Sequence, residues 1–214
     1  MQKRTLSYKC PYCSKELDVD VVLSINASID QHEKERLMSA DLFYQHCEYC
    51  QHDFLLQVPF TYVDKERKFV VVLSVAEILP KEVMQTGKDL DHAGYKLRHV
   101  QTIQQLIEKI QIFEDGLDDR LVELAKYDHF IEFIDNKKGK PSDITSIEYQ
   151  KVENGVMKIN IRTGDSGMAF LTPLNLIEEE FKMDKDRLSI YNASYPKIDQ
   201  KWIVSVYKPA DGKA

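Results

Sequence analysis

The stretch KCPYCSKELDVDVVLSI (residues 9–25) sets a Cys-x-x-Cys pair directly before a run of alternating apolar residues. A second pair occurs in HCEYCQHDFLLQV (residues 46–58), where apolar residues again follow the cysteines. Between Cys13 and Cys47 lie 33 residues. The repeated pattern raises two questions: whether the pairs form one site, and whether that site performs chemistry or stabilises the fold.

One zinc ion would explain both pairs. Zinc binds four ligands in a tetrahedron, and a Cys-x-x-Cys turn supplies two thiolates. The long separation is tolerated because closure entropy grows only logarithmically with loop length, and Pro11 restricts the first turn. A redox dithiol would leave the second pair without a role, and unrelated buried cysteines would not repeat their spacing. The expected ligands are Cys10, Cys13, Cys47 and Cys50.

Four thiolates would close the coordination shell. Catalytic zinc keeps an open position for water, whereas structural zinc does not. The metal would then contribute folding free energy, about 10 to 16 kcal/mol in zinc-finger peptides. His46 and His52 flank the second pair and could replace a thiolate, but residues adjacent to a ligand in such a turn usually point away. We therefore expect a structural Zn2+ and no catalytic residues at this site.

Composition bounds the class of protein. The chain has 214 residues, of which 43% are hydrophobic and 30% charged, as in soluble globular proteins. No apolar run approaches the ~20 residues that cross a bilayer, and the N-terminal residues lack the apolar core of a signal peptide. We therefore expect a cytoplasmic protein without membrane contact. Cytoplasmic thiols are kept reduced, which favours metal binding over disulfides.

The net charge of −6 argues against a general nucleic-acid-binding protein, which usually carries a basic excess. Residues 76–136 carry 7 basic and 13 acidic side chains, whereas residues 137–214 carry 13 and 11. A local basic surface could therefore lie in the last third. The basic run NKKGK (residues 136–140) is better explained as a solvated linker.

The residues around the cysteines predict strands and one helix. Alternating apolar residues predict a strand in residues 16–25, and a helix is expected within residues 28–43, where Ser28 or Asp30 can cap it. Residues 53–75 predict an antiparallel hairpin that turns at DKER. The cysteines thus belong to a zinc-ribbon-like antiparallel β module with an inserted strand and helix.

Helical periodicity marks the middle of the chain. Apolar residues spaced by three and four predict an amphipathic helix over residues 99–114, and Gly116 supplies its stop. A second helix follows with Asp118 as its cap. Its expected buried face consists of Leu121, Leu124, Ala125 and Ile131. The two segments predict a helical hairpin.

The last third predicts a hairpin, a helix and a closing strand. Asn154-Gly155 supplies the positive φ angles of a two-residue turn. TPLNLIEEEFK predicts a helix that Thr172 caps, with Pro173 at its first position. KWIVSVYK (residues 201–208) is expected to be a strand whose apolar residues belong to the core.

These elements predict an α+β fold in two domains. The polar segment 136–143 is the expected boundary. Residues 1–135 would form the zinc-ribbon-like domain with the helical hairpin. Residues 144–214 would form a smaller C-terminal α+β domain.

Other groups of residues could carry chemistry, although we favour simpler roles. Acidic residues that could bind a divalent cation lie where helix caps are expected: Glu114, Asp115, Asp118 and Asp119. No spacing demands a catalytic or second metal site from the histidines: His92, His99 and His129. RTGDSGMAF (residues 162–170) has glycines but no phosphate-loop lysine, so we expect it to connect two elements.

Several segments in order carry a family resemblance: CPYC, ELDVDVVLSINASID, LFYQHCEYCQHDFLLQVPFTYVDKERKFVVVL and KLRHVQTIQQLIEKIQIFEDGLDDRLVELAK. Together they resemble the CPXC domain family, bacterial proteins named for two Cys-Pro-x-Cys motifs. The resemblance covers about residues 8–126 and implies a zinc-ribbon-like module followed by helices, with the four cysteines as its metal site. It implies no particular activity. The sequence departs from the family pattern at Glu48, where the second motif would have proline.

Three functions fit this sequence. The first, which we favour, is a non-enzymatic, zinc-stabilised module that binds a protein partner. The second is a nucleic-acid-associated zinc-ribbon protein, with aromatic residues that stack on bases: Tyr12, Tyr49, Phe60 and Tyr62. The third is an enzyme that uses the acidic or histidine groups, which would require a pocket with perturbed titratable residues.

Overall fold

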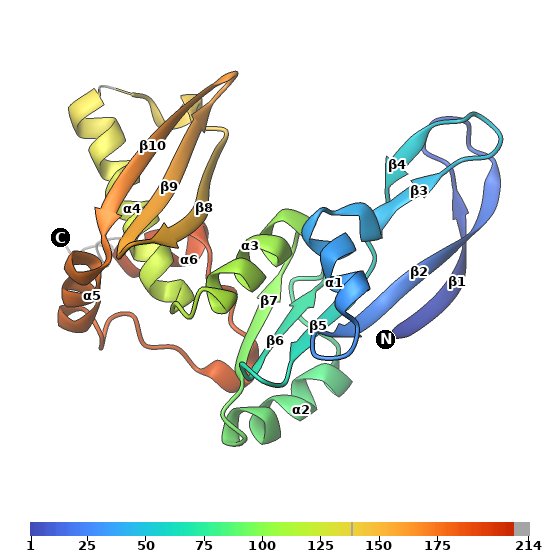
Figure 1. The fold of residues 1–214 in the computed structure, drawn as a ribbon, viewed down its shortest axis with the longest axis horizontal. Coiled ribbons are helices and arrows are strands. Elements are labelled where there is room, and N and C mark those ends of the chain that lie inside the picture. Colours follow the sequence, from blue (N-terminus) through green and yellow to red (C-terminus); the bar gives the residue numbers. More distant parts are fainter. Residues whose placement is uncertain (138, 208–214) are drawn as a thin grey trace, which may run out of the picture. The chain divides into compact units, whose positions relative to one another are not determined.

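The computed structural model describes residues 1–137 and 139–207. The chain forms two compact units. The first comprises Met1–Ile107 and Asn192–Pro196, and the second comprises Glu108–Tyr191 and the residues from Lys197 onward. Helices and a β-sheet occur in each unit, so the fold class is α+β, as the sequence predicts (Figure 1). The compact units do not coincide with the domains expected at 1–135 and 144–214, and whether those domains fold independently stays a prediction.

A five-stranded sheet forms the centre of the first unit. Its strand order is β1-β2-β5-β6-β7, with β1–β2 and β5–β6 antiparallel and β2–β5 and β6–β7 parallel. The predicted strand after the first cysteine pair and the predicted hairpin at DKER are both confirmed. The first and last strands of the sheet are not expected from the sequence. The strands are β1 (Gln2–Lys9), β2 (Glu16–Asn26), β5 (Phe60–Asp64), β6 (Phe69–Leu73) and β7 (Lys96–Val100).

Two helices and a small second hairpin accompany this sheet. The short strands β3 (Tyr44–His46) and β4 (Asp53–Leu55) pair with each other, and α2 (Lys81–His92) precedes β7. The predicted helix near Asp30 is α1 (Gln31–Met38). Asp30 does not cap α1 with its side chain, because that carboxylate accepts a hydrogen bond from the Asn26 N–H at 2.8 Å.

A late part of the chain completes the first unit. We call residues 192–196 the return segment, because they lie between two stretches of the second unit in sequence yet pack against α2 and β7. The Asn192 side chain accepts from the Leu97 N–H at 3.0 Å and from the Arg98 guanidinium at 3.1 Å. It donates to Asp91 Oδ1 at 2.7 Å and to the Tyr95 carbonyl at 2.8 Å. The return segment therefore covers the outer edge of β7.

The second unit contains a three-stranded antiparallel sheet and helices. β8 (Ser146–Glu153), β9 (Val156–Thr163) and β10 (Ser166–Pro173) are ordered β10-β9-β8. The turn at Asn154-Gly155 is confirmed, with φ angles of 52° and 73°. The helices are α4 (Asp119–Lys137), α5 (Leu174–Met183) and α6 (Gln200–Tyr207), and α3 (Ile103–Glu114) ends in this unit. None of the described helices is long and apolar enough to cross a membrane.

Charged residues join α3 and α4 inside the second unit. Lys109 Nζ lies 3.0 Å from Asp119 Oδ2, and both side chains are almost fully buried. Lys126 Nζ lies 2.7 Å from Glu108 Oε2 and 3.1 Å from Glu123 Oε1. Burying these charges costs free energy that the pairing and hydrogen bonds offset. The helical hairpin is therefore fixed in register by ion pairs as well as by apolar contact.

Three predicted elements are wrong in part or whole. The helix predicted over 99–114 begins only at Ile103, since residues 99 and 100 belong to β7. KWIVSVYK is not a strand: α6 covers most of it, Asp199 Oδ1 accepts from the Trp202 N–H at 2.9 Å at its start, and Ile203 is fully buried. Residue 208 lies outside the described residues.

The helix predicted to begin at Thr172 and Pro173 begins one position later. Both residues still belong to β10, and Pro173 is the residue that precedes the first turn of α5. On α4, Leu121, Leu124 and Ala125 are buried as expected, but Ile131 is 39% exposed. Ile131 is therefore not on the buried face of α4, which continues at Phe133.

Candidate metal centre

Each cysteine pair lies at the tip of a β-hairpin. Cys10 and Cys13 lie between β1 and β2, and the second pair lies between β3 and β4. The Cys10 N–H donates to the Lys15 carbonyl at 2.9 Å, and its own carbonyl accepts from Ser14 N–H at 2.9 Å. The alternating apolar residues after Cys13 form β2, and the pairing of β2 with β1 holds the Cys10–Cys13 turn in place.

The second tip repeats the same hydrogen bonds. The Cys47 N–H donates to the His52 carbonyl at 3.0 Å, and the Cys47 carbonyl accepts from Gln51 N–H at 2.8 Å. The residue after the second cysteine of each pair is left-handed, with φ of 60° at Ser14 and 59° at Gln51. Neither position is glycine, so the sequence gives no sign of this turn. The equal geometry shows that Glu48, in place of proline, leaves the turn intact.

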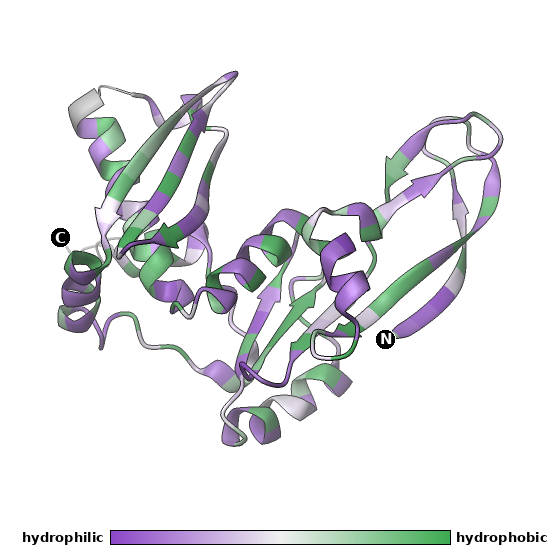
Figure 2. Cartoon of the chain, viewed as in Figure 1, coloured by the Kyte–Doolittle hydropathy of each residue, from purple (hydrophilic) through white to green (hydrophobic). Residues whose placement is uncertain are grey.

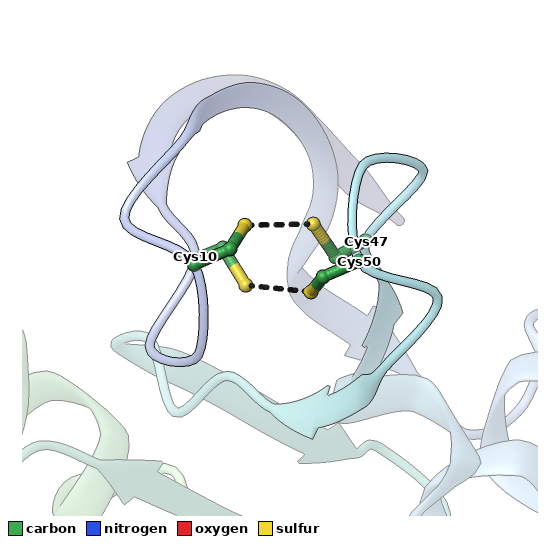
Figure 3. A group of neighbouring side chains, drawn as sticks. Cys10, Cys47 and Cys50 are labelled. Atoms are coloured by element: carbon green, nitrogen blue, oxygen red, sulfur yellow. Dashed lines mark hydrogen bonds between the residues drawn. The ribbon is translucent and has the colours of Figure 1, made fainter.

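The four sulfur atoms converge. All four Sγ atoms lie within 4.8 Å of one another. Across the two hairpins, the Cys10 and Cys50 Sγ atoms are 3.6 Å apart, and the Cys13 and Cys47 Sγ atoms are 3.7 Å apart (Figure 3). A zinc–sulfur distance of ~2.3 Å in a tetrahedron requires sulfur atoms ~3.8 Å apart. A disulfide would need ~2.05 Å. The spacing therefore fits four ligands around one metal ion.

The centre lies against an apolar cluster. Cys10 and Cys47 are 1% and 0% exposed, whereas Cys13 and Cys50 are half-buried. The buried residues that pack with them come from both hairpins and the segment that follows: Val19, Val21, Phe54, Leu56 and Val58. This packing holds the two tips together and shields the sulfur atoms from water on one side.

The thiols differ in acidity because burial and hydrogen bonds act on each of them to a different extent. Burial acts to raise the pKa of Cys10, but hydrogen bonds from the backbone N–H groups of Cys13 and Tyr12 and from neighbouring thiols lower it to about 6. Burial, together with the neighbouring sulfur atoms, raises the pKa of Cys50 to about 12. At Cys13 a hydrogen bond from the Lys15 N–H favours the thiolate, but burial and adjacent sulfur atoms outweigh it and raise the pKa. Four thiolates this close together would repel one another, and a cation among them would offset that repulsion.

The neighbouring histidines do not join the sulfur atoms. His46 Nδ1 pairs with Asp53 Oδ1 at 2.7 Å, and this hydrogen bond raises the His46 pKa. His52 Nδ1 lies 2.8 Å from the Cys50 carbonyl oxygen, and its ring stacks on Tyr12 with centroids 4.7 Å apart. Neither ring belongs to the group of potential ligands, which consists of cysteines only.

The acidic residues at the junction of α3 and α4 pair with other residues of the same chain. Asp118 Oδ1 accepts from the Arg120 N–H at 3.0 Å at the start of α4, which confirms the predicted cap. Asp119 pairs with Lys109, and Asp115 accepts a hydrogen bond from the Tyr149 hydroxyl. Within the part of the chain that the structure describes, the four cysteines are the single group of three or more potential metal ligands.

The three histidines considered in the sequence also form no joint site among the described residues. His99 Nε2 lies 3.0 Å from the Ser74 carbonyl oxygen. His129 contacts Thr172 and Glu132 through its ring nitrogens, and burial lowers its pKa. RTGDSGMAF comprises the end of β9, the two-residue turn and the first part of β10, so its interpretation as a connection of two elements is confirmed.

The comparison with protein families agrees with the family resemblance found in the sequence. Residues 8–126 match the model of the family described as CpXC protein, and this stretch includes both cysteine pairs. The chain belongs to the CpXC family. For this CpXC chain, a search of curated proteins and a search of solved structures found no match. The family match therefore supports the cysteine site and leaves residues 127–214 to be interpreted from the structure itself.

Proposed function

We propose that the four cysteines hold one structural zinc ion, and that this CpXC protein acts as a non-enzymatic protein-interaction module in the bacterial cytoplasm. The observation that carries the metal assignment is the separation of the sulfur atoms, 3.6 and 3.7 Å across the hairpins. These values lie close to the ~3.8 Å edge of a zinc–thiolate tetrahedron. Cys10, Cys13, Cys47 and Cys50 would hold the ion.

A structural role follows from the donor set. Four thiolates fill a tetrahedral shell, so no position remains for water or substrate. The bound ion would join two hairpins that are separate in sequence, β1–β2 and β3–β4. Its binding free energy would then contribute to folding. We therefore assign no catalytic step to this centre.

Exposed aromatic and apolar side chains around the centre support a role in binding. Tyr12 and Tyr49 are 61% and 64% exposed, one at the tip of each hairpin. Tyr44 and Leu55 are directly opposite each other on β3 and β4, and each is about half exposed. Tyrosine is enriched in protein interfaces because it buries a large apolar ring and keeps a hydroxyl for hydrogen bonding. The zinc would hold these four side chains in fixed relative positions.

The aromatic residues favour a protein partner over nucleic acid. Phe60 and Tyr62 were candidates for base stacking, but they are 1% and 0% exposed and belong to the core. The net charge of −6 also opposes binding to phosphates. A nucleic-acid-associated role would rest on Tyr12 and Tyr49 alone, so we propose a protein as the partner.

Metal analysis tests the first half of this proposal. Protein purified without chelators should contain about one zinc per chain, and Cys47→Ser should lose most of it. Less than about half an equivalent of zinc, with four free thiols, would overturn the assignment.

Cross-linking in cells tests the second half. The double variant Tyr12→Ser/Tyr49→Ser should keep its zinc but lose the cross-linked protein partner. Tyr191→Ser removes a tyrosine of similar exposure (63%) from another part of the chain and should retain the partner. Recovery of nucleic acid instead, lost in the same double variant, would replace our proposal with the alternative.

A further inference from the structure

Three of the four edges of the two larger sheets are protected. An exposed strand edge offers unpaired N–H and C=O groups to other chains, and proteins protect such edges with charges, bulges or covering groups. On β1, the side chains of Lys3, Arg4 and Lys9 are exposed. On β7, the outward Leu97 N–H is bonded by Asn192 of the return segment.

The β8 edge is covered by side chains from α3. The Tyr149 N–H donates to Glu108 Oε1 at 2.6 Å, and the Gln150 carbonyl accepts from the Gln111 amide. A register shift between Tyr149 and Lys151 interrupts the strand as well. Pairing with another strand is therefore blocked on this side of the sheet.

Among the described residues, β10 shows none of these protections. Its sequence, SGMAFLTP, contains no charged residue, and all eight residues pair with β9 on one side. On its other side no strand of the described chain pairs with it. In Figure 2, β10 is mostly pale or green, whereas β1 has strongly hydrophilic segments. β10 is thus a regular strand with an open, uncharged edge.

The hairpin fixes which backbone groups point outward. Thr163 and Ser166 flank the two-residue turn Gly164-Asp165, and the pair that closes such a turn exchanges both hydrogen bonds. Alternate residues from Ser166 onward therefore bond β9. The N–H and C=O groups of the residues between them are directed away from β9: Gly167, Ala169 and Leu171.

The side chains of these outward residues occupy the open face of the sheet. Phe170 lies on the opposite face, where its ring centroid is 4.7 Å from that of His129 on α4. Leu171 is 67% exposed. The open face of the edge thus presents a small residue, Ala169, between a glycine and an exposed leucine.

We propose that β10 pairs antiparallel with β10 of a second copy of this chain, about a two-fold axis at Ala169. In this register Gly167 lies opposite Leu171 of the second copy, and Ala169 lies opposite its equivalent. Each of these pairs exchanges two hydrogen bonds, so the outward groups make about six. Pro173, which has no N–H, ends the pairing.

The sequence of β10 suits a second copy better than an unrelated strand. Two-fold pairing sets the central residue against itself, and a charge there would repel its equivalent. Ala169 avoids this repulsion. The exposed side chain of Leu171 is placed over Gly167, which has no side chain. The shared surface is a single strand, so we expect dissociation in roughly the micromolar range.

Two variants test this pairing in the full-length, metal-loaded protein. Ala169→Lys sets two positive charges against each other and should make the protein monomeric by light scattering after gel filtration. Gly167→Val should do the same by filling the space over which Leu171 lies. It is accommodated in the monomer, because a Cβ at Gly167 has only the Ile161 carbonyl oxygen near it, at 4.0 Å. Met183→Lys, a matched exposed change on α5, should stay dimeric.

Amide exchange tests the register. In the dimer, the amides of Gly167, Ala169 and Leu171 should be slowed tenfold or more relative to Ala169→Lys, with no such change at Met168 and Phe170. Circular dichroism should show that both variants fold. A wild-type chain that stays monomeric at its highest soluble concentration would overturn the proposal. So would a dimer that survives both variants, or protection of the outward amides only when a different protein is added.

Discussion

Replacing Gly87 with alanine tests how the return segment is held. In the middle of an exposed helix this change stabilises by about 1 kcal/mol, because alanine has the higher helix propensity. Gly87 lies in α2 but faces the return segment. A Cβ at Gly87 would lie 2.1 Å from the Ala193 carbonyl oxygen and 3.3 Å from the Tyr195 ring. The nearest atom belongs to the backbone, so the segment itself must move.

The expected cost follows from what that movement would break. Asn192 makes four side-chain hydrogen bonds, to Leu97, Arg98, Asp91 and Tyr95. At about 0.5 to 1.5 kcal/mol each, they contribute about 2 to 6 kcal/mol. Less the helix-propensity gain of about 1 kcal/mol, Gly87→Ala should destabilise by about 1 to 5 kcal/mol. Urea denaturation measures the difference.

Two further variants make the result decisive. Gln85→Ala, an exposed change two residues away on the same helix, should leave stability nearly unchanged. Asn192→Ala should destabilise by itself, and combining it with Gly87→Ala should cost much less than the sum, because both changes release the same segment. If Gly87→Ala proves as stable as the wild type, the close approach of the Ala193 carbonyl does not constrain this site.

Three other changes have defined outcomes. Asp118→Ala removes the cap of α4 and should lower the free energy of unfolding by about 1 kcal/mol, with Asp118→Asn as the retaining control. Burial, followed by the charges of Glu180 and Asp184, raises the pKa of Asp128 to about 7. The favourable contribution of the protonated side chain to the free energy of unfolding is therefore complete below pH ~4 and is lost as the pH rises through 7. Asp128→Asn should therefore be more stable than the wild type at pH 8, by about 1 kcal/mol after solvent screening, and equal to it below pH ~4; a pH-independent difference would contradict this. Cys47→Ser should lower the melting temperature and lose most of the bound zinc, and a chelator should then have little further effect on the variant.

The parts of the fold predicted from sequence have strong local signals. The alternation from Leu17 to Leu23 predicts β2. Asn154-Gly155 predicts the β8–β9 hairpin, because few other residues adopt positive φ at both positions of the turn. The repeated cysteine spacing predicts one site, and the four sulfur atoms converge. In each case the local preference and the tertiary structure agree.

The elements missed or misassigned depend on distant parts of the chain. The outer edge of β7 is bonded by Asn192, about a hundred residues later in the chain, so the residues near Leu97 do not predict this strand by themselves. The apolar, β-branched residues of KWIVSVYK predict a strand, but packing against α4 and the Asp199 cap make it a helix. The turn conformation of Ser14 and Gln51 has no glycine to mark it. Tertiary contacts outweigh local propensity at β7 and α6.

The central claim is that Cys10, Cys13, Cys47 and Cys50 surround one structural zinc ion. Extended X-ray absorption fine structure at the zinc edge of the purified protein measures that shell directly. We predict four sulfur atoms at ~2.3 Å and no nitrogen or oxygen ligand. A first shell that contains nitrogen or oxygen, or a protein that binds no zinc while its four thiols are reduced, would contradict the account.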